Sequence, residues 1–237
     1  GHALGAEAPV LIEVDDLERV SAGSVMACAI KGDAGEVTCW GGTTDVQHLG
    51  RGTADGDPWT PGPVIRHDDG VLIGATEVVA GSATGPNSCA VVTDGAVWCW
   101  GEYYNYYGTA PLEDNDYVAH QVILAGTDTP LTGMSQLATS TYHACATQNA
   151  PGPLYCWGHD GSGALGTDAV DDEANSEGAV LVADFGDVID VAVSETNTCA
   201  VRADHKVFCW GDNAHGQLGD LSGLSQSTPA LVPTLSG

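Results

Sequence analysis

The chain has 237 residues, of which six are basic and 32 are acidic, and its formal net charge at pH 7 is −26. Because nucleic acid and anionic membrane surfaces repel so acidic a protein, we expect no nucleic-acid partner and no membrane insertion. No apolar run approaches the roughly 18 residues of a membrane span, and the first ten residues lack the basic and apolar regions of a signal peptide.

Four similar units follow one another along the chain. The first begins with the apolar stretch PVLIEV at residues 9–14, continues with ERVSAG at residues 18–23, and ends with the hairpin sequence CAIKGDAGEVTCWGG at residues 28–42. The corresponding stretches of the later units are residues 62–67, 76–81 and 89–102, then 120–125, 135–140 and 145–159, and finally 178–183, 189–194 and 199–212. Each unit therefore offers four short strands separated by turns, with the apolar stretch as its first strand.

The units are centred on Trp40, Trp100, Trp157 and Trp210, and their spacing of about 57 residues fills the chain, so we expect a single domain spanning residues 1–237. The last strand of a unit is apolar on both faces, as in the run Val97–Trp100. Such a strand has to be covered on both sides, which happens when four-stranded blades pack face to face around an axis. The sequence thus predicts an all-β fold, a β-propeller.

Each unit carries two cysteines, one on each strand of its hairpin. A loop of three residues separates the two strands in the second and fourth units, and a loop of four residues in the first and third, which keeps the cysteines directly opposed. Opposed residues of an antiparallel pair lie close enough for a disulfide, whereas structural zinc prefers a Cys-x-x-Cys spacing that the chain lacks. We expect one disulfide in each blade, which pairs Cys28 with Cys39, Cys89 with Cys99, Cys145 with Cys156, and Cys199 with Cys209. Four disulfides indicate an oxidising location: secreted, periplasmic or at the cell surface.

The loop after the last Cys-Trp-Gly reads CWGDNAHGQLGD, and together with the Cys-Ala hairpins it resembles the RCC1 repeat, in particular the cysteine-bearing type of secreted bacterial proteins. The matching residues are Gly211, Asn213, Gly216, Gln217, Leu218 and Gly219 in the last unit, Gly158, Gly163, Leu165 and Gly166 in the third, and Gly41, Leu49 and Gly50 in the first. The resemblance implies a propeller that binds other proteins. It also implies that His143, just before its hairpin, is a packing residue. Nucleotide exchange and chromatin docking, known in eukaryotic members, need a basic surface, so we do not expect them here.

Seven blades are usual in that family, whereas this chain has four repeats. The repeats could close as a four-bladed ring, which we favour, belong to a longer ring, or complete a ring as a homodimer. The stretch STPALVPTLSG at the carboxyl end resembles the first strand of a further unit.

Two segments are candidate sites. The loop GEYYNYYG at residues 101–108 replaces the standard loop of the repeat, and its tyrosines are candidate partner contacts: Tyr103, Tyr104, Tyr106 and Tyr107. At least one of these rings should instead pack against the neighbouring blade. The oxygen-rich run Glu113, Asp114, Asn115 and Asp116 is a weak candidate for Ca²⁺, the one cofactor that we consider.

Motif searches find no phosphate-binding glycine loop, no His-Glu-x-x-His and no Gly-x-Ser-x-Gly, so we expect no enzymatic activity. The function that we expect is that of a non-catalytic extracytoplasmic binding platform for a protein or a glycan. The alternative is a calcium-stabilised structural module of a larger surface protein.

Overall fold

The computed structural model describes residues 15–42, 47–53, 56–81, 88–101, 117–168 and 175–233, and it consists of four antiparallel four-stranded sheets. Blade 1 contains β1 (Leu17–Ala22), β2 (Met26–Lys31), β3 (Glu36–Gly41) and β4 (Gly62–Pro63); blade 2 contains β5 (Ala75–Val79), β6 (Ser88–Val92), β7 (Val97–Trp100) and β8 (His120–Gln121). Blade 3 contains β9 (Met134–Thr139), β10 (His143–Gln148), β11 (Leu154–His159) and β12 (Asn175–Leu181); blade 4 contains β13 (Val188–Val193), β14 (Asn197–Arg202), β15 (Val207–Gly211) and β16 (Gln226–Leu231). Short 3₁₀ turns at Gln47–Leu49 and Gly161–Gly163 follow β3 and β11. No described helix is long and apolar enough to cross a membrane.

The central hairpin of every blade has the predicted register. Cys28 lies opposite Cys39, and the same pairing returns in blades 2, 3 and 4. All four pairs form disulfides with Cα–Cα distances of 4.1 Å. The turn residues Gly95 and His205 have positive φ values of 76° and 62°, which suit a three-residue hairpin loop. The prediction of one disulfide in each blade is confirmed.

The phase of the repeat differs from the expected one. The apolar stretch that was assigned to the start of each unit pairs with the strand before it, as β4 does with β3 and β8 with β7. Likewise β16, part of the stretch expected to open a further unit, is the outer strand of blade 4. The outer strand thus completes the blade whose hairpin precedes it. The first such stretch, residues 9–14, lies outside the described residues.

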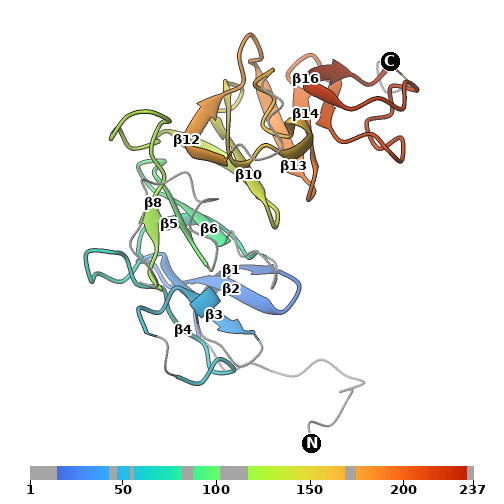
Figure 1. Ribbon diagram of the computed structural model, residues 1–237. Coiled ribbons are helices and arrows are strands. Elements are labelled where there is room, and N and C mark those ends of the chain that lie inside the picture. The colour runs from blue at the N-terminus through green and yellow to red at the C-terminus, as the bar shows by residue number, and fades with distance from the viewer. Residues whose placement is uncertain are drawn as a thin grey trace, which may run out of the picture.

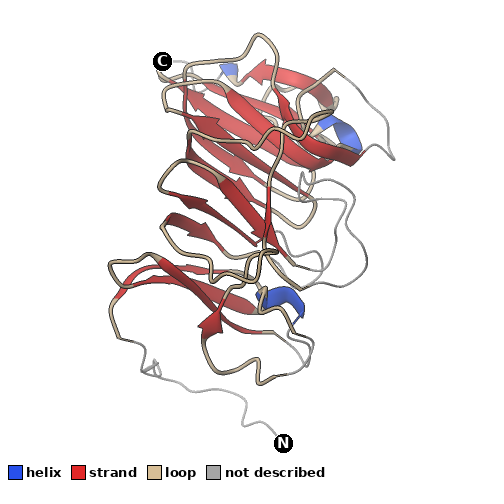
Figure 2. Ribbon diagram, turned by 90° about the vertical axis from the view of Figure 1, so that its left-hand side faces the viewer, coloured by secondary structure: helices blue, strands red, loops and turns tan. Residues whose placement is uncertain are grey.

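Each blade has two faces of different composition, because successive side chains of a strand point to opposite sides. We call the side that carries the cysteines the disulfide face and the side that carries the tryptophan of Cys-Trp-Gly the tryptophan face. The buried clusters pair the disulfide face of one blade with the tryptophan face of the next: Cys28 with Trp100, Cys99 with Trp157, and Cys156 with Trp210. Figure 2 shows the successive sheets stacked side by side. The core is therefore a series of three interfaces between blades.

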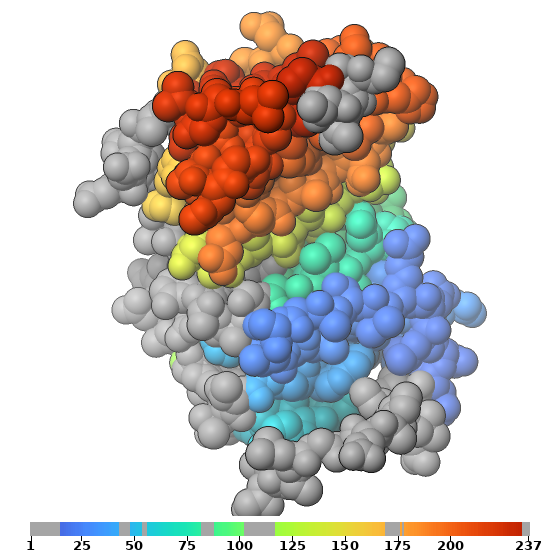
Figure 3. Space-filling model, turned by 90° about the vertical axis from the view of Figure 1, so that its right-hand side faces the viewer, coloured from blue at the N-terminus to red at the C-terminus, as the bar shows by residue number. Residues whose placement is uncertain are grey.

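The stack of blades follows an arc, with blade 1 at one end and blade 4 at the other (Figures 1 and 3). Consecutive blades are joined by packing of β2 on β5, β6 on β9 and β10 on β13. Among the described residues, blade 4 has no comparable packing against blade 1. The favoured expectation of a ring closed by four blades within one chain is therefore wrong. The angle between each blade and the next sets this arc, and three such steps leave the two end blades apart.

Candidate functional site

The inner strands of all four blades, β1, β5, β9 and β13, end at one groove with a volume of about 490 Å³, which we call the axial groove. Its lining consists mainly of small residues at these strand ends, among them Gly23, Ser24, Gly81, Ser140 and Ser194. A groove at the axis draws one short segment from every blade, so the repeat itself builds the site.

Small residues are required at the axis because the strand ends approach closely there. A Cβ atom on Gly23 would lie 1.7 Å from the carbonyl oxygen of Gly81, so no larger residue fits. Beside this contact, the hydroxyl of Ser21 accepts a hydrogen bond of 3.0 Å from the amide of Ala80. Blades 1 and 2 are thereby joined at the wall of the groove by a hydrogen bond from a backbone amide to a side-chain hydroxyl.

Hydroxyl groups shape the rim of the groove on blades 3 and 4. Ser140 Oγ accepts a hydrogen bond of 3.2 Å from the amide of His143. Ser194 Oγ accepts one of the same length from the amide of Asn197. Such side-chain bonds to the backbone fix a turn between two strands. The rim therefore has a defined shape and presents polar groups, with Glu195 as its one carboxylate among the lining residues.

His143 does not line the groove itself but contacts Ser140, which does. The ring is fully buried; its Nε2 lies 2.8 Å from Thr198 Oγ1 and its Nδ1 3.3 Å from Ser140 Oγ. Burial, together with the smaller effect of nearby His159, lowers the pKa of His143 to about 4, so the ring is neutral at neutral pH. The interpretation of His143 as a packing residue agrees with this geometry.

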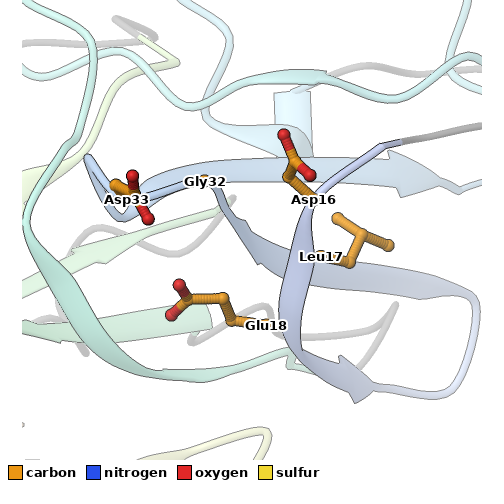
Figure 4. Close-up of a pocket in the computed structure, with 5 residues that line it drawn as sticks. All are labelled: Asp16, Leu17, Glu18, Gly32 and Asp33. Atoms are coloured by element: carbon orange, nitrogen blue, oxygen red, sulfur yellow. The ribbon is translucent and has the colours of Figure 1, made fainter.

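A second hollow lies between the start of β1 and the turn that joins β2 to β3. It is lined by Asp16, Leu17, Glu18, Gly32 and Asp33. Three carboxylates in one hollow suggest a cation, but in Figure 4 they point in different directions rather than at a common point. No group of three or more potential ligands among the described residues is arranged to hold a metal ion. The hollow has an acidic surface without the geometry of a metal site.

The sequence candidates fall into two groups. The eight cysteines form disulfides between the blade strands and do not reach the groove. The tyrosines Tyr103, Tyr104, Tyr106 and Tyr107 and the oxygen-rich run Glu113, Asp114, Asn115 and Asp116 lie in residues 102–116, outside the described residues. Sequence analysis missed the axial groove, although its signal was present: small residues recur at the end of the second stretch of every unit, in VSAG, VVAG, LATS and VAVS.

Comparisons with known proteins identify the repeat. Models of the regulator of chromosome condensation (RCC1) repeat match residues 188–217 and 204–237. The human E3 ubiquitin-protein ligase HERC2 is 31% identical over 165 residues, which are 66% of this chain and 3% of HERC2.

Solved structures show the same fold. The structure of human WBSCR16 superposes with a TM-score of 0.73 at 18% identity, covering 94% of this chain and 55% of that one. Prp20p from Saccharomyces cerevisiae superposes with a TM-score of 0.68 at 17% identity, covering 94% of this chain and 52% of that one. The chain thus spans about half of these structures and a small part of HERC2. Its carboxy-terminal part carries RCC1 repeats, and its four blades have an RCC1-like fold.

Proposed function

We propose that the domain formed by residues 1–237 is a non-catalytic platform that binds a partner protein at the axial groove. The observation that carries the proposal is the convergence of four inner strand ends on one groove with a fixed, polar rim. A rim of hydroxyl and peptide groups matches an extended loop of another protein, which presents the complementary donors and acceptors.

The fold supports a protein as the partner. Prp20p, which shares this fold, binds Gsp1p and histones, and these partners belong to Prp20p. For the present chain, the net charge of −26 favours a partner with a basic contact surface, because opposite potentials speed association and suppress wrong partners. A glycan is the other ligand that a hydroxyl-rich groove accommodates, and the experiment below distinguishes the two.

The working location that we propose is oxidising and extracytoplasmic. Its support is the four disulfides, with no free cysteine among the described residues. Cytosolic reductants keep such cysteines as thiols, so the disulfides are stable in a periplasm, on a cell surface or outside the cell.

The test is capture with a groove variant and a matched surface variant. Ser194→Arg places a long cation in the groove, whereas Ala214→Arg places the same side chain on an exposed loop of the same blade. Immobilised wild type, Ser194→Arg and Ala214→Arg are exposed to the surface and medium proteins of the producing organism and, separately, to a glycan array.

We expect a protein retained by wild type and Ala214→Arg and lost with Ser194→Arg. Retention by all three proteins would place binding elsewhere, and a signal on the array alone would replace the protein partner by a glycan. For the calcium-stabilised alternative, a melting temperature that chelator leaves unchanged would count against it.

A further inference from the structure

The interface between blades repeats one detail in the described structure. A leucine and a glycine at the end of the loop after Cys-Trp-Gly lie against the tryptophan of the next blade. A Cβ atom on Gly50 would come within 2.7 Å of Trp100 Cδ1, and one on Gly166 within 2.8 Å of Trp210 Nε1. We call this Leu-Gly position the tryptophan cradle. It places the indole ring against bare backbone, which only glycine allows.

Blade 4 has the same cradle on its disulfide face, at Leu218 and Gly219. A Cβ atom on Gly219 would meet only Val232 within 4 Å, so no tryptophan of the described residues lies there. Gly219 is half-buried, whereas Gly50 and Gly166 are buried. Cys199 is likewise half-buried, whereas the cysteines of the other three blades have no exposed surface. The disulfide face of blade 4 is therefore built like the other three, and no other blade of the described residues covers it.

Blade 1 shows the opposite half of the same interface. One position on the innermost strand is 6% exposed at Val78, 7% at Leu137 and 8% at Val191, because the preceding blade covers it. The corresponding residue of blade 1, Val20, is 68% exposed. Trp40 is half-buried, whereas the equivalent tryptophans of the other blades are completely buried. Blade 1 thus presents an uncovered tryptophan face.

We propose that these two end faces bind each other between two copies of the chain: Trp40 of one copy enters the Leu218–Gly219 cradle of the other. The three interfaces within the chain show that the two kinds of face are complementary, and the arc keeps the two end faces of one chain apart (Figure 1). Four blades cover 55% and 52% of the RCC1-like structures, so two arcs suffice to close a ring. The pair has twofold symmetry and contains two identical head-to-tail contacts.

A second copy also completes the axial groove, since it adds four further inner strand ends around the axis. The proposal therefore adds a state of assembly to the binding platform, and its test does not depend on the partner. Molar mass is measured by sedimentation equilibrium over a series of concentrations. We expect a two-chain species of twice 24.2 kDa.

Two variants block the two faces separately. Val20→Asp places a charge on the tryptophan face of blade 1, and Ala230→Asp places one on the disulfide face of blade 4, where Ala230 lies opposite Cys209. Because an unpaired charge would be buried in the contact, each should raise the dissociation constant by about 100-fold. The control is Leu181→Asp, the same change at a 49% exposed position on blade 3, which should leave the dissociation constant unchanged.

An equimolar mixture of Val20→Asp and Ala230→Asp should regain a two-chain species, because the intact disulfide face of the first meets the intact tryptophan face of the second. Circular dichroism melts of each variant establish that the fold is kept. A single-chain mass of the wild type at every concentration would overturn the proposal. Species of more than two chains would also overturn it. So would a dissociation constant that only one of the two face variants raises, or one that Leu181→Asp raises equally.

Discussion

His143 in blade 3 donates a hydrogen bond from Nε2 to the hydroxyl of Thr198 in blade 4, with 2.8 Å between the two atoms. Both side chains are fully buried in the interface between the blades. The direction of the bond is set by Thr198, whose own hydroxyl donates to the carbonyl of Ala164 at 2.9 Å. The same carbonyl accepts the indole Nε1 of Trp210 at 2.9 Å. One chain of hydrogen bonds therefore joins the two blades next to the tryptophan cradle.

Replacing Thr198 by valine tests this connection. Thr198→Val keeps the shape of the side chain but leaves the Nε2 proton of His143 buried without an acceptor, which costs about 1–3 kcal/mol of unfolding free energy. The control is Thr228→Val, at an exposed position of β16, which should change stability little. Urea unfolding of both variants measures the difference, and equal stabilities would show that the bond contributes nothing.

The buried imidazole also makes stability depend on pH. Because the pKa of His143 is about 4 in the folded chain and 6.5 ordinarily, the unfolded chain binds the proton first as the pH falls. Its contribution is therefore complete above about pH 6.5 and is lost as the pH falls toward 4, by about 3 kcal/mol in total. The variant His143→Met removes the titrating group. Methionine suits the position because Met26 occupies the equivalent place in blade 1. We expect the unfolding free energy of this variant to fall less steeply than that of the wild type between pH 6.5 and pH 4; parallel curves would contradict the assignment.

Local features of the sequence predicted the blades correctly. The loop between Cys89 and Cys99 determines which residues face each other, so the register and the disulfide follow from a few neighbouring residues. The outer strands were placed in the wrong unit because an apolar stretch carries no sign of which neighbour it pairs with, and β4 and β8 are only two residues long.

Closure and the axial groove depend on relationships that no single stretch encodes. The angle between successive blades results from packing such as that of Trp100 against Gly50, and small errors in it accumulate around an axis. The groove is assembled from segments such as Gly23 and Ser194 that are far apart in the chain. Small residues at strand ends also occur wherever two backbones approach, so the pattern alone did not indicate a site.

The four disulfides should differ in their rates of reduction. Cys199 is half-buried and Cys209 is 4% exposed, whereas the other six cysteines have no exposed surface. Since exchange requires a thiolate to reach a sulfur atom, the bond between Cys199 and Cys209 should be reduced first. Loss of one such bond lowers the unfolding free energy by about 2–3 kcal/mol in the chain-entropy model. Timed exposure of dilute protein to a reductant, followed by alkylation and peptide mass spectrometry, gives the order; simultaneous labelling of all pairs would indicate global unfolding instead.

The cradle glycines offer a matched pair of substitutions. Gly50 and Gly219 have φ values of +68° and +65°, so the backbone strain of an alanine is the same at both positions. The new methyl group of Gly50→Ala meets the ring of Trp100 at 2.7 Å, whereas that of Gly219→Ala meets only Val232 at 3.1 Å. Overpacking of the ring should make Gly50→Ala less stable than Gly219→Ala by about 1–3 kcal/mol. Urea unfolding at concentrations where the chains sediment singly measures this difference, and equal losses would mean that the indole ring shifts to admit the methyl group without cost.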